Sequence, residues 1–353
     1  MAATTTPNNF NLLATLQPPM KSVGKTAFRR LQRLGGGSLF LSVPHVWVLS
    51  NGLKKGSLVS IDEAPDGSLI IRGGTPSPGS TIYAQEIDAE QVASDDFWAR
   101  FYGVYLSGAD IVNVRVFGAA SDSLRTKVRE AAKRLPGLEL ADEGQTTMTF
   151  RFMLDISAMK PDHLIRRISS ISSALYTGAF ETRDSGRGLS TVGIEQKMSD
   201  MNRLNALASR VLSGCEENAA LSAELGIPPA SAAEYMVVLG SLKKIGEIGA
   251  ELCRVVGSKM IAGSGGLPNV SVENLKILQD SVVQTFLTLG KDAYGLLNRC
   301  RSQMMSTEVS IWQAASSLEA CLLHEIEREI TEIAECSVRL RSRTRLMGGG
   351  SKR

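Results

Sequence analysis

The chain has 353 residues, with 39 Lys and Arg against 36 Asp and Glu, 43% hydrophobic residues and only 5% aromatic residues. This length predicts two or three domains, and the near balance of charge excludes a protein that binds polyanions over its whole surface. The first 20 residues lack the charged start and apolar core of a signal peptide, and no window of about 18 residues is uninterruptedly apolar. We therefore expect a cytoplasmic protein without membrane insertion.

The segment 29–72 predicts a small unit rich in β-structure. Residues 38–43 alternate between apolar and mixed side chains, which indicates a strand. Pro44 opens a short helical turn, and Asn51-Gly52 closes it because glycine accepts the left-handed conformation of helix ends. A hairpin follows. Its strands are expected at 58–61 and 69–71, and the turn between them at Asp66-Gly67. A unit this small cannot bury its own apolar face, so we expect it to pair with a second copy.

The order of these elements resembles the AbrB/SpoVT-type swapped-hairpin DNA-binding domain over about residues 25 to 75. The shared pattern is a basic segment, a strand, proline, a short helix, Gly-Leu-Lys-x-Gly at 52–56, a strand, Asp-Gly and a strand. The resemblance implies a β-barrel of interlocked hairpins from two chains. The family usually has an acid after the glycine of its turn, where this chain has Ser57. A serine weakens the expected turn, although its hydroxyl can still accept a hydrogen bond from a backbone N–H.

The charge of the first 61 residues points to nucleic acid. They contain seven basic residues and not one Asp or Glu. Such an excess, doubled in a dimer, is typical of a surface that binds phosphates. The alternative is an ordinary solvated face beside a disordered basic tail. Because the charge coincides with the swapped-hairpin pattern, we predict DNA contact by Lys25, Arg29, Arg30, Arg33, Lys54 and Lys55, with Lys21 as the seventh basic residue.

Residues 81–155 predict a small α/β module beyond the Gly-, Pro- and Ser-containing linker 73–80. The expected elements are a helix over 88–106 ended by Gly108, a strand over 111–116, a basic helix over 121–135 and a closing strand pair at 138–140 and 146–154. The module carries no catalytic constellation. We expect a spacer and dimerisation element.

From Pro161 the pattern changes to long helices. Apolar residues recur at three- and four-residue spacing, as in Ile194, Met198, Met201, Leu204, Leu207 and Val211. Five helices of about thirty residues, among them 161–182, 230–260, 272–300 and 307–345, predict an antiparallel bundle over 161–345. The fold class is therefore α+β and multidomain. The ends, 1–24 and 346–353, are expected to be disordered tails.

Parts of the bundle resemble the PhoU family, regulators of phosphate uptake. The segments are Asp200-Met201-Asn202-Arg203-Leu204, Leu242-Lys243-Lys244-Ile245-Gly246-Glu247 and Glu332-Ile333-Ala334-Glu335. An AbrB-like domain ahead of a PhoU-like bundle is an archaeal-type arrangement of one regulator. The resemblance implies a homodimeric regulator of phosphate uptake whose bundle receives a signal, through a phosphate ABC transporter or its ATPase subunit.

The PhoU resemblance also implies metal clusters held by carboxylates, since hard cations need clustered oxygens. Here Asn202 and Lys243 stand where the family usually has acids, and Glu247 replaces an Asp. We therefore expect no metal and no cofactor. Carboxylates do share helix faces, but such stripes are usually the solvent side of a helix: Glu247 with Glu251, and Glu325 with Glu329 and Glu332.

Other chemical motifs do not support an enzyme. Gly35-Gly36-Gly37-Ser38 lacks the Gly-Lys-Ser/Thr ending of a phosphate loop and is expected to form a turn. The three histidines lie in different segments, at His45, His163 and His324. The cysteines form no CxxC pair, so buried reduced thiols are expected at Cys215, Cys253, Cys300, Cys321 and Cys336.

Three functions stay open at this point. The first is a DNA-binding transcriptional regulator of phosphate uptake. The second is a PhoU-type adaptor that does not bind DNA, dimerises through its AbrB-like domain and modulates a phosphate ABC transporter. The third, a metal-dependent enzyme, would need bound metal and turnover.

Overall fold

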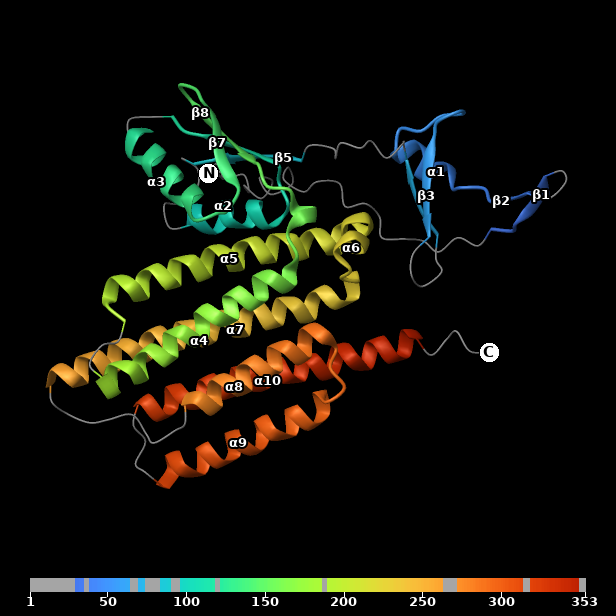
Figure 1. Cartoon of the computed structure of the whole chain (residues 1–353). Helices are drawn as coiled ribbons and strands as arrows, with labels where there is room; N and C mark the ends of the chain where they lie inside the picture. The colour runs from blue at the N-terminus through green and yellow to red at the C-terminus, as the bar shows by residue number, and fades with distance from the viewer. Residues whose placement is uncertain are drawn as a thin grey trace, which may run out of the picture. The chain divides into compact units, whose positions relative to one another are not determined.

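The computed structural model describes residues 29–34, 38–63, 69–73, 83–89, 96–117, 121–185, 189–262, 272–313 and 318–348. The chain divides into two compact units, Met1–Pro78 (unit 1) and Gly79–Arg353 (unit 2), whose elements are labelled in Figure 1. The tail expected at 1–24 lies outside the described residues. The tail expected at 346–353 overlaps the last helix, which ends at Gly348. Residues 349–353 of that tail lie outside the described residues.

Unit 1 contains two antiparallel strand pairs and one short helix. The first pair joins β1 (Gln32–Leu34) to β2 (Ser38–Phe40), and the second joins β3 (Val59–Glu63) to β4 (Leu69–Gly73). Among the described residues the two pairs form separate sheets. The strand expected over 38–43 ends at Phe40, and β1 was not predicted. The turns expected at Gly35-Gly36-Gly37 and Asp66-Gly67 lie outside the described residues, between paired strands.

The helix of unit 1, α1 (His45–Ser50), begins and ends where the sequence predicts. Pro44 caps its N-terminus, and the Pro44 carbonyl accepts the Val48 amide at 3.1 Å. At the other end Gly52 has a φ of +64°, and the Leu53 amide donates to the Val48 carbonyl at 2.9 Å. This left-handed residue turns the chain out of the helix without the steric cost of a Cβ atom.

The α/β module of unit 2 is a four-stranded sheet with two helices. Its elements are β5 (Ala84–Asp88), α2 (Asp96–Leu106), β6 (Ile111–Arg115), α3 (Ser121–Lys133), β7 (Leu138–Glu143) and β8 (Thr147–Phe152). The strand order is β5-β6-β8-β7, with β5 parallel to β6 and the other pairs antiparallel. Phe101 and Tyr105 of α2 pack with Val112, Val114 and Phe150 in the module's core.

The helix predicted over 88–106 starts too early, because its first residue, Asp88, belongs to strand β5. Asp88 instead ends β5, opposite Arg115, and the helix begins at Asp96. Ile87 is the one buried residue within β5, so the strand has almost no apolar pattern of its own. Its conformation comes from pairing with β6, a contact that local sequence does not reveal. The helix end at Gly108 (φ +82°) and the strand pair β7–β8 are confirmed.

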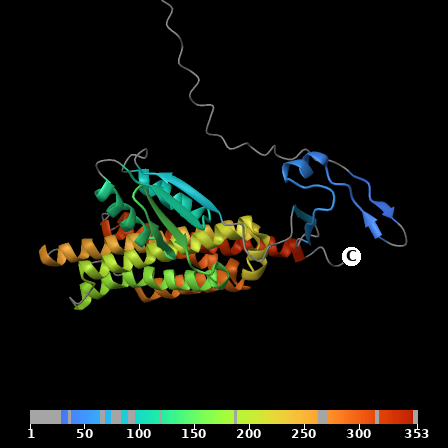
Figure 2. The same cartoon turned by 90° about the horizontal axis from the view of Figure 1, so that it is seen from above.

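The bundle follows a short 3₁₀ turn, Ile156–Ala158. Its helices are α4 (Pro161–Ser185), α5 (Thr191–Glu217), α6 (Ala219–Leu225), α7 (Pro229–Ala262), α8 (Val272–Thr288), α9 (Ala293–Gln313) and α10 (Leu318–Gly348). The stripe predicted on α5 faces the interior, with Met201, Leu207 and Val211 buried. Figure 2 shows the module lying against the helices of the bundle. Within the described part of the chain, every helix is too short or too polar to cross a membrane.

The prediction of one continuous helix over 272–300 is wrong, because the first helix ends at Thr288 and a second begins at Ala293. Leu289 adopts a φ of +50°, and the Gly290 amide turns back to the Thr285 carbonyl at 2.9 Å. Arg341 of α10 donates to the exposed carbonyls of Leu289 and Gly290, at 2.8 and 2.6 Å. The predicted start of the last helix, at Thr307, is also wrong. α9 continues to Gln313, and α10 begins at Leu318. The expected linker at Gly263–Pro268 and the cap at Ser271 lie outside the described residues.

Candidate functional site

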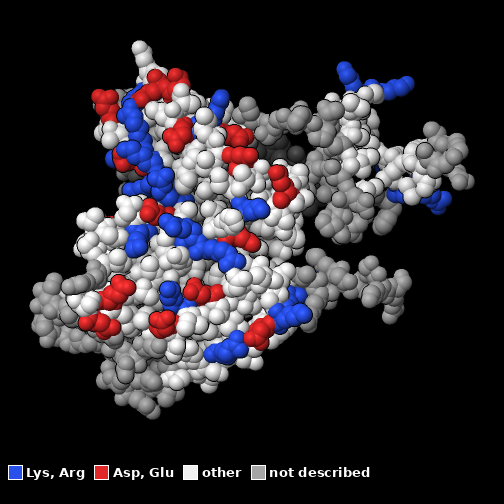
Figure 3. All heavy atoms as spheres, in the orientation of Figure 1, with Lys and Arg blue, Asp and Glu red and all other residues white. Residues whose placement is uncertain are grey.

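The basic residues predicted to contact DNA lie in two places on unit 1. Arg29 and Arg30 are exposed just before β1, and Lys54 and Lys55 are exposed in the turn between α1 and β3. Arg33 lies in β1 opposite Leu39. Lys25 and the Arg33 side chain lie outside the described part of the structure. On the face of unit 1 that Figure 3 shows, the described basic side chains lie in separate groups.

The turn that carries Lys54 and Lys55 is held by Ser57. The Lys54 amide donates to the Ser57 hydroxyl at 3.0 Å, and the Ser57 amide returns to the Lys54 carbonyl at 2.9 Å. The Ser57 hydroxyl thus accepts a hydrogen bond from a backbone N–H, as expected from the sequence. Gly56 completes the turn with a φ of +89°. The backbone is therefore fixed, while both ammonium groups remain in solvent.

No described side chain of unit 1 is buried. Its large apolar side chains are instead between 38% and 76% exposed: Leu31, Leu39, Phe40, Leu41, Val43, Val46, Leu49, Leu58, Val59, Ile61 and Leu69. Isolated exposed apolar residues are ordinary on protein surfaces, but a contiguous set marks an interaction surface. The described part of unit 1 thus has apolar side chains without a core to hold them.

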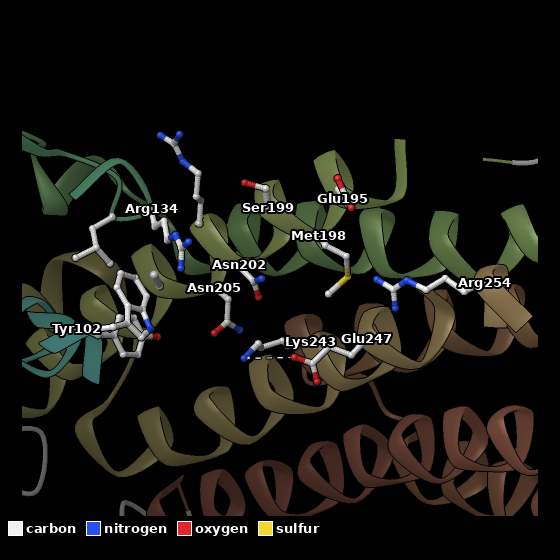
Figure 4. Close-up of a pocket in the computed structure, with 14 residues that line it drawn as sticks. Tyr102, Arg134, Glu195, Met198, Ser199, Asn202, Asn205, Lys243, Glu247 and Arg254 are labelled. Atoms are coloured by element: carbon white, nitrogen blue, oxygen red, sulfur yellow. Dashed lines mark ion pairs between the residues drawn. The ribbon is translucent and has the colours of Figure 1, made fainter. Parts of the chain in front are cut away.

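A groove of about 540 Å³ lies in unit 2 where the α/β module meets the bundle. Figure 4 shows Tyr102 of α2 and Arg134, which follows α3, at one end, and Arg254 of α7 at the other. Between them lie Asn202 of α5 and Lys243 of α7. The volume is within the range of small-molecule sites, about 300–1,000 Å³.

Positive charge predominates in the groove. Arg134, Arg203, Lys243 and Arg254 line it, against the carboxylates of Glu195 and Glu247. Lys243 lies 3.5 Å from Glu247, and Arg254 lies 3.1 Å from Glu251. Within the described residues, neither Arg134 nor Arg203 forms an ion pair with an acid. The lining of the groove therefore carries more basic than acidic side chains.

Two aromatic rings form the wall at one end of the groove. Trp98 and Tyr102, one helical turn apart on α2, stack with ring centroids 5.6 Å apart and an interplanar angle of 18°. The Arg134 guanidinium lies over the Trp98 ring, 5.4 Å from its centroid. Burial raises the pKa of the Tyr102 hydroxyl, so it stays protonated at neutral pH. A cation is thus held beside a polar aromatic wall.

Two of the three segments that the sequence analysis singled out in the bundle, 200–204 and 242–247, meet at this groove. Asn202 comes from the first, and Lys243 and Glu247 come from the second. The third segment lies on α10, where Glu332 and Glu335 contact Arg339 at 2.8 and 3.7 Å. Three residues of the groove were not predicted from the sequence, because the module was interpreted as a spacer: Trp98, Tyr102 and Arg134. The aromatic pair at i and i+4 was the available signal, but it does not reveal which helices lie opposite.

The carboxylate stripes do not converge. Among the described residues, no group of three or more His, Cys, Asp or Glu side chains is placed to hold a metal ion. Each stripe contains acids that pair with arginine instead: Glu251 with Arg254, Glu329 with Arg328 at 3.5 Å, and Glu332 with Arg339. The three histidines lie on α1, α4 and α10.

The cysteines are all free thiols. Cys215, Cys253, Cys300 and Cys336 are buried as expected, whereas the expectation is wrong for Cys321, which is exposed. Burial raises the pKa of Cys253 and of Cys300 to about 11. These thiols are therefore protonated and unreactive at neutral pH.

Comparison with protein-family models, with curated proteins and with solved structures finds no match to this chain.

Proposed function

We propose that this protein is a DNA-binding transcriptional regulator related to the control of phosphate uptake and that it acts as a homodimer. The supporting observation is that unit 1 combines exposed basic side chains with apolar side chains that it cannot bury alone. In the proposal, unit 1 holds the DNA and the PhoU-like bundle of unit 2 receives the signal.

A second copy of unit 1 is the occupant proposed for the exposed apolar side chains. Seven of the eleven side chains lie on β2, α1, β3 and β4, and the other four, Leu31, Leu41, Val43 and Leu58, lie close to elements of unit 1 in the chain. Burial of apolar surface stabilises by about 25 cal/mol per Å². Exchange of hairpins between two chains would supply each unit with the core it lacks and close the two sheets into one swapped barrel.

The same pairing doubles the basic side chains. Arg29 and Arg30 before β1, and Lys54 and Lys55 before β3, would each occur twice around a two-fold axis. Arginine suits phosphates and guanine edges, and lysine suits phosphates. A dimer can therefore present the separate basic groups of one chain to a two-fold symmetric DNA site.

The signal in this proposal reaches the bundle, directly or through a phosphate ABC transporter or its ATPase subunit, and changes how the two copies of unit 1 are presented. The support is the resemblance of segments on α5, α7 and α10 to the PhoU family. The alternative is an adaptor that does not bind DNA. The exposed apolar side chains also favour this alternative, since they would dimerise the chain whether or not DNA is bound.

A salt-dependent mobility-shift experiment separates the two functions. The full chain is mixed with genomic promoter fragments at a series of salt concentrations. A regulator retards the fragments at about 150 mM salt, and the logarithm of its affinity falls linearly with log salt. A dimer that leaves all fragments unshifted at low and physiological salt is the adaptor.

A further inference from the structure

We propose that the groove between α2, α3, α5 and α7 binds a phosphorylated small molecule that carries a planar ring, of the nucleotide class. This ligand site is independent of DNA binding by unit 1, because every residue that lines it belongs to unit 2. Three features of the groove support the assignment: its charge, its aromatic wall and its polar floor.

The charges in the groove select an anion. Four basic side chains line the groove with two carboxylates, and among the described residues neither Arg134 nor Arg203 forms an ion pair within 4 Å, although Arg134 interacts electrostatically with the exposed Glu130. Lys243 does have one, Glu247, but the two side chains are 41% and 43% exposed and their closest atoms are 3.5 Å apart. Ion pairs this exposed contribute little, so the ammonium of Lys243 can turn to a ligand phosphate at small cost.

The aromatic wall selects a planar group beside that anion. Trp98 and Tyr102 are both partly exposed. Tyr102 lies at the same end of the groove as Arg134 (Figure 4), and the Trp98 ring contacts both of these residues. Arg134 is already held over the Trp98 ring, which fixes the guanidinium at the rim before any ligand arrives. A base can stack against this guanidinium–indole–phenol group, with its phosphates directed along the groove toward Lys243.

Neutral polar groups between the charged ends complete the site. Asn202 and Asn205 project from α5 between Tyr102 and Lys243 (Figure 4). Asn205 is held in place because its Nδ2 donates to the Leu239 carbonyl at 3.2 Å. Amide groups supply both donors and acceptors for the edges of a base or the hydroxyls of a sugar. A bare oxyanion would leave these amides and the aromatic wall unused, within a groove of about 540 Å³.

The experiment measures binding to the full-length protein in a buffer without divalent cations. ATP, AMP, adenosine, inorganic phosphate and tripolyphosphate are titrated by calorimetry, with tryptophan fluorescence as a second readout. We expect at least one of the two nucleotides to bind about tenfold more tightly than adenosine and both inorganic anions. Its binding should quench a fluorescence component that Trp98→Phe removes, although Trp47 and Trp312 remain.

A neighbouring lysine provides the matched control. Lys243→Glu should weaken nucleotide binding by about tenfold or more, whereas Lys244→Glu, which makes the same charge change on an exposed side chain that does not line the groove, should leave it unchanged. Lys243→Gln should give an intermediate loss in a fully folded protein.

Four results would overturn the proposal. The first is the absence of nucleotide binding at about 1 mM ligand, and the second is equal affinity in the two charge-reversed variants. Inorganic anions that bind as tightly as nucleotides would remove the role of the aromatic wall. Adenosine that binds as tightly as both nucleotides would remove the role of the basic side chains.

Discussion

The guanidinium of Arg210 donates to the main-chain carbonyl of Tyr105 at 2.6 Å, and its charged carbon lies 5.1 Å from the centre of the Tyr105 ring. The same side chain reaches the Ala109 carbonyl at 3.1 Å and lies 3.8 Å from the centre of the Phe152 ring. Arg210 is only 1% exposed, although it belongs to α5 of the bundle. It therefore joins the end of α2 to the bundle through a fully buried cation.

Replacement of Arg210 by methionine should destabilise unit 2. Burial lowers the pKa of the guanidinium, yet an arginine stays charged at neutral pH. Its loss would leave the buried carbonyl of Ala109 without a donor among the described residues, and that of Tyr105 with only the Gly108 amide at 3.3 Å. An unsatisfied buried carbonyl costs about 1–3 kcal/mol. We expect the free energy of unfolding in urea to fall by about 3 kcal/mol.

Two other substitutions control for the loss of charge. Arg203→Met, on an exposed residue of the same helix, should change stability by no more than about 0.5 kcal/mol. Arg210→Lys should recover only part of the loss, because an ammonium lacks the planar guanidinium that lies beside the Tyr105 and Phe152 rings. Equal urea midpoints for Arg210→Met and the parent would contradict the proposed contribution of this side chain.

The fragment 25–75 should be a dimer with interlocked hairpins, since its described side chains form no core. Sedimentation equilibrium at micromolar concentration measures this. In the full chain, Leu39→Asp together with Ile61→Asp should shift the mass toward monomer and leave unit 2 folded. A folded monomeric fragment would refute the swapped-hairpin assignment.

Arg29→Ala/Arg30→Ala/Arg33→Ala should weaken DNA binding strongly. If these side chains meet phosphates, the slope of log affinity against log salt should become shallower by about 0.9 for each phosphate that the variant no longer neutralises. Lys54→Ala/Lys55→Ala should weaken binding more evenly across sequences. The matched control replaces three exposed lysines of unit 2 by alanine, at Lys127, Lys244 and Lys276, and should bind as the parent does. Equal affinity of the arginine variant and this control at about 150 mM salt would favour the adaptor.

Purified protein should contain less than about one equivalent of iron, zinc or manganese per chain. In the groove, where segments 200–204 and 242–247 meet, basic side chains outnumber carboxylates, and a hard cation needs clustered oxygens. Elemental analysis after mild dialysis tests this. A multinuclear cluster would show that ligands lie elsewhere, with Glu325, Glu329 and Glu332 the first to replace.

Alkylation of the native protein at pH 8 should modify Cys321 first, because it is the exposed thiol. Cys253 and Cys300 have pKa values of about 11, so only about one molecule in a thousand carries the reactive thiolate at that pH. The modification rate of these two should rise roughly tenfold per pH unit until the fold is disrupted. Peptide mass spectrometry after short exposure to iodoacetamide gives the order. Early modification of Cys253 would contradict the packing around it.

The sequence was informative where local periodicity and turn chemistry agreed. The stripe through Met201, Leu207 and Val211 predicted the buried face of α5, and Asn51-Gly52 predicted the end of α1. Prediction from the sequence failed where a contact with a residue far away in the chain is part of the local structure. β5 depends on pairing with β6, and the break at Leu289 depends on Arg341 of another helix.

The residues of the groove also fall into those that the sequence singled out and those that it did not. Asn202, Lys243 and Glu247 stand in segments recognisable from the sequence, and the structure brings them to one place. Trp98, Tyr102 and Arg134 come from the module, and nothing in their spacing shows that α5 and α7 lie against them. DNA contact by Arg29, Arg30, Lys54 and Lys55 stays a prediction.

The position of α10 in the chain has a consequence for how the protein is made. Its buried Ile326, Ile330 and Ile333 belong to the same core as Leu175 of α4 and Leu242 of α7. During synthesis the earlier helices leave the ribosome with that core open, and they wait for α10 before they can close it. Unit 1 emerges well before this point, so the pairing proposed for unit 1 would be open to a nascent chain while its own bundle is still unfinished.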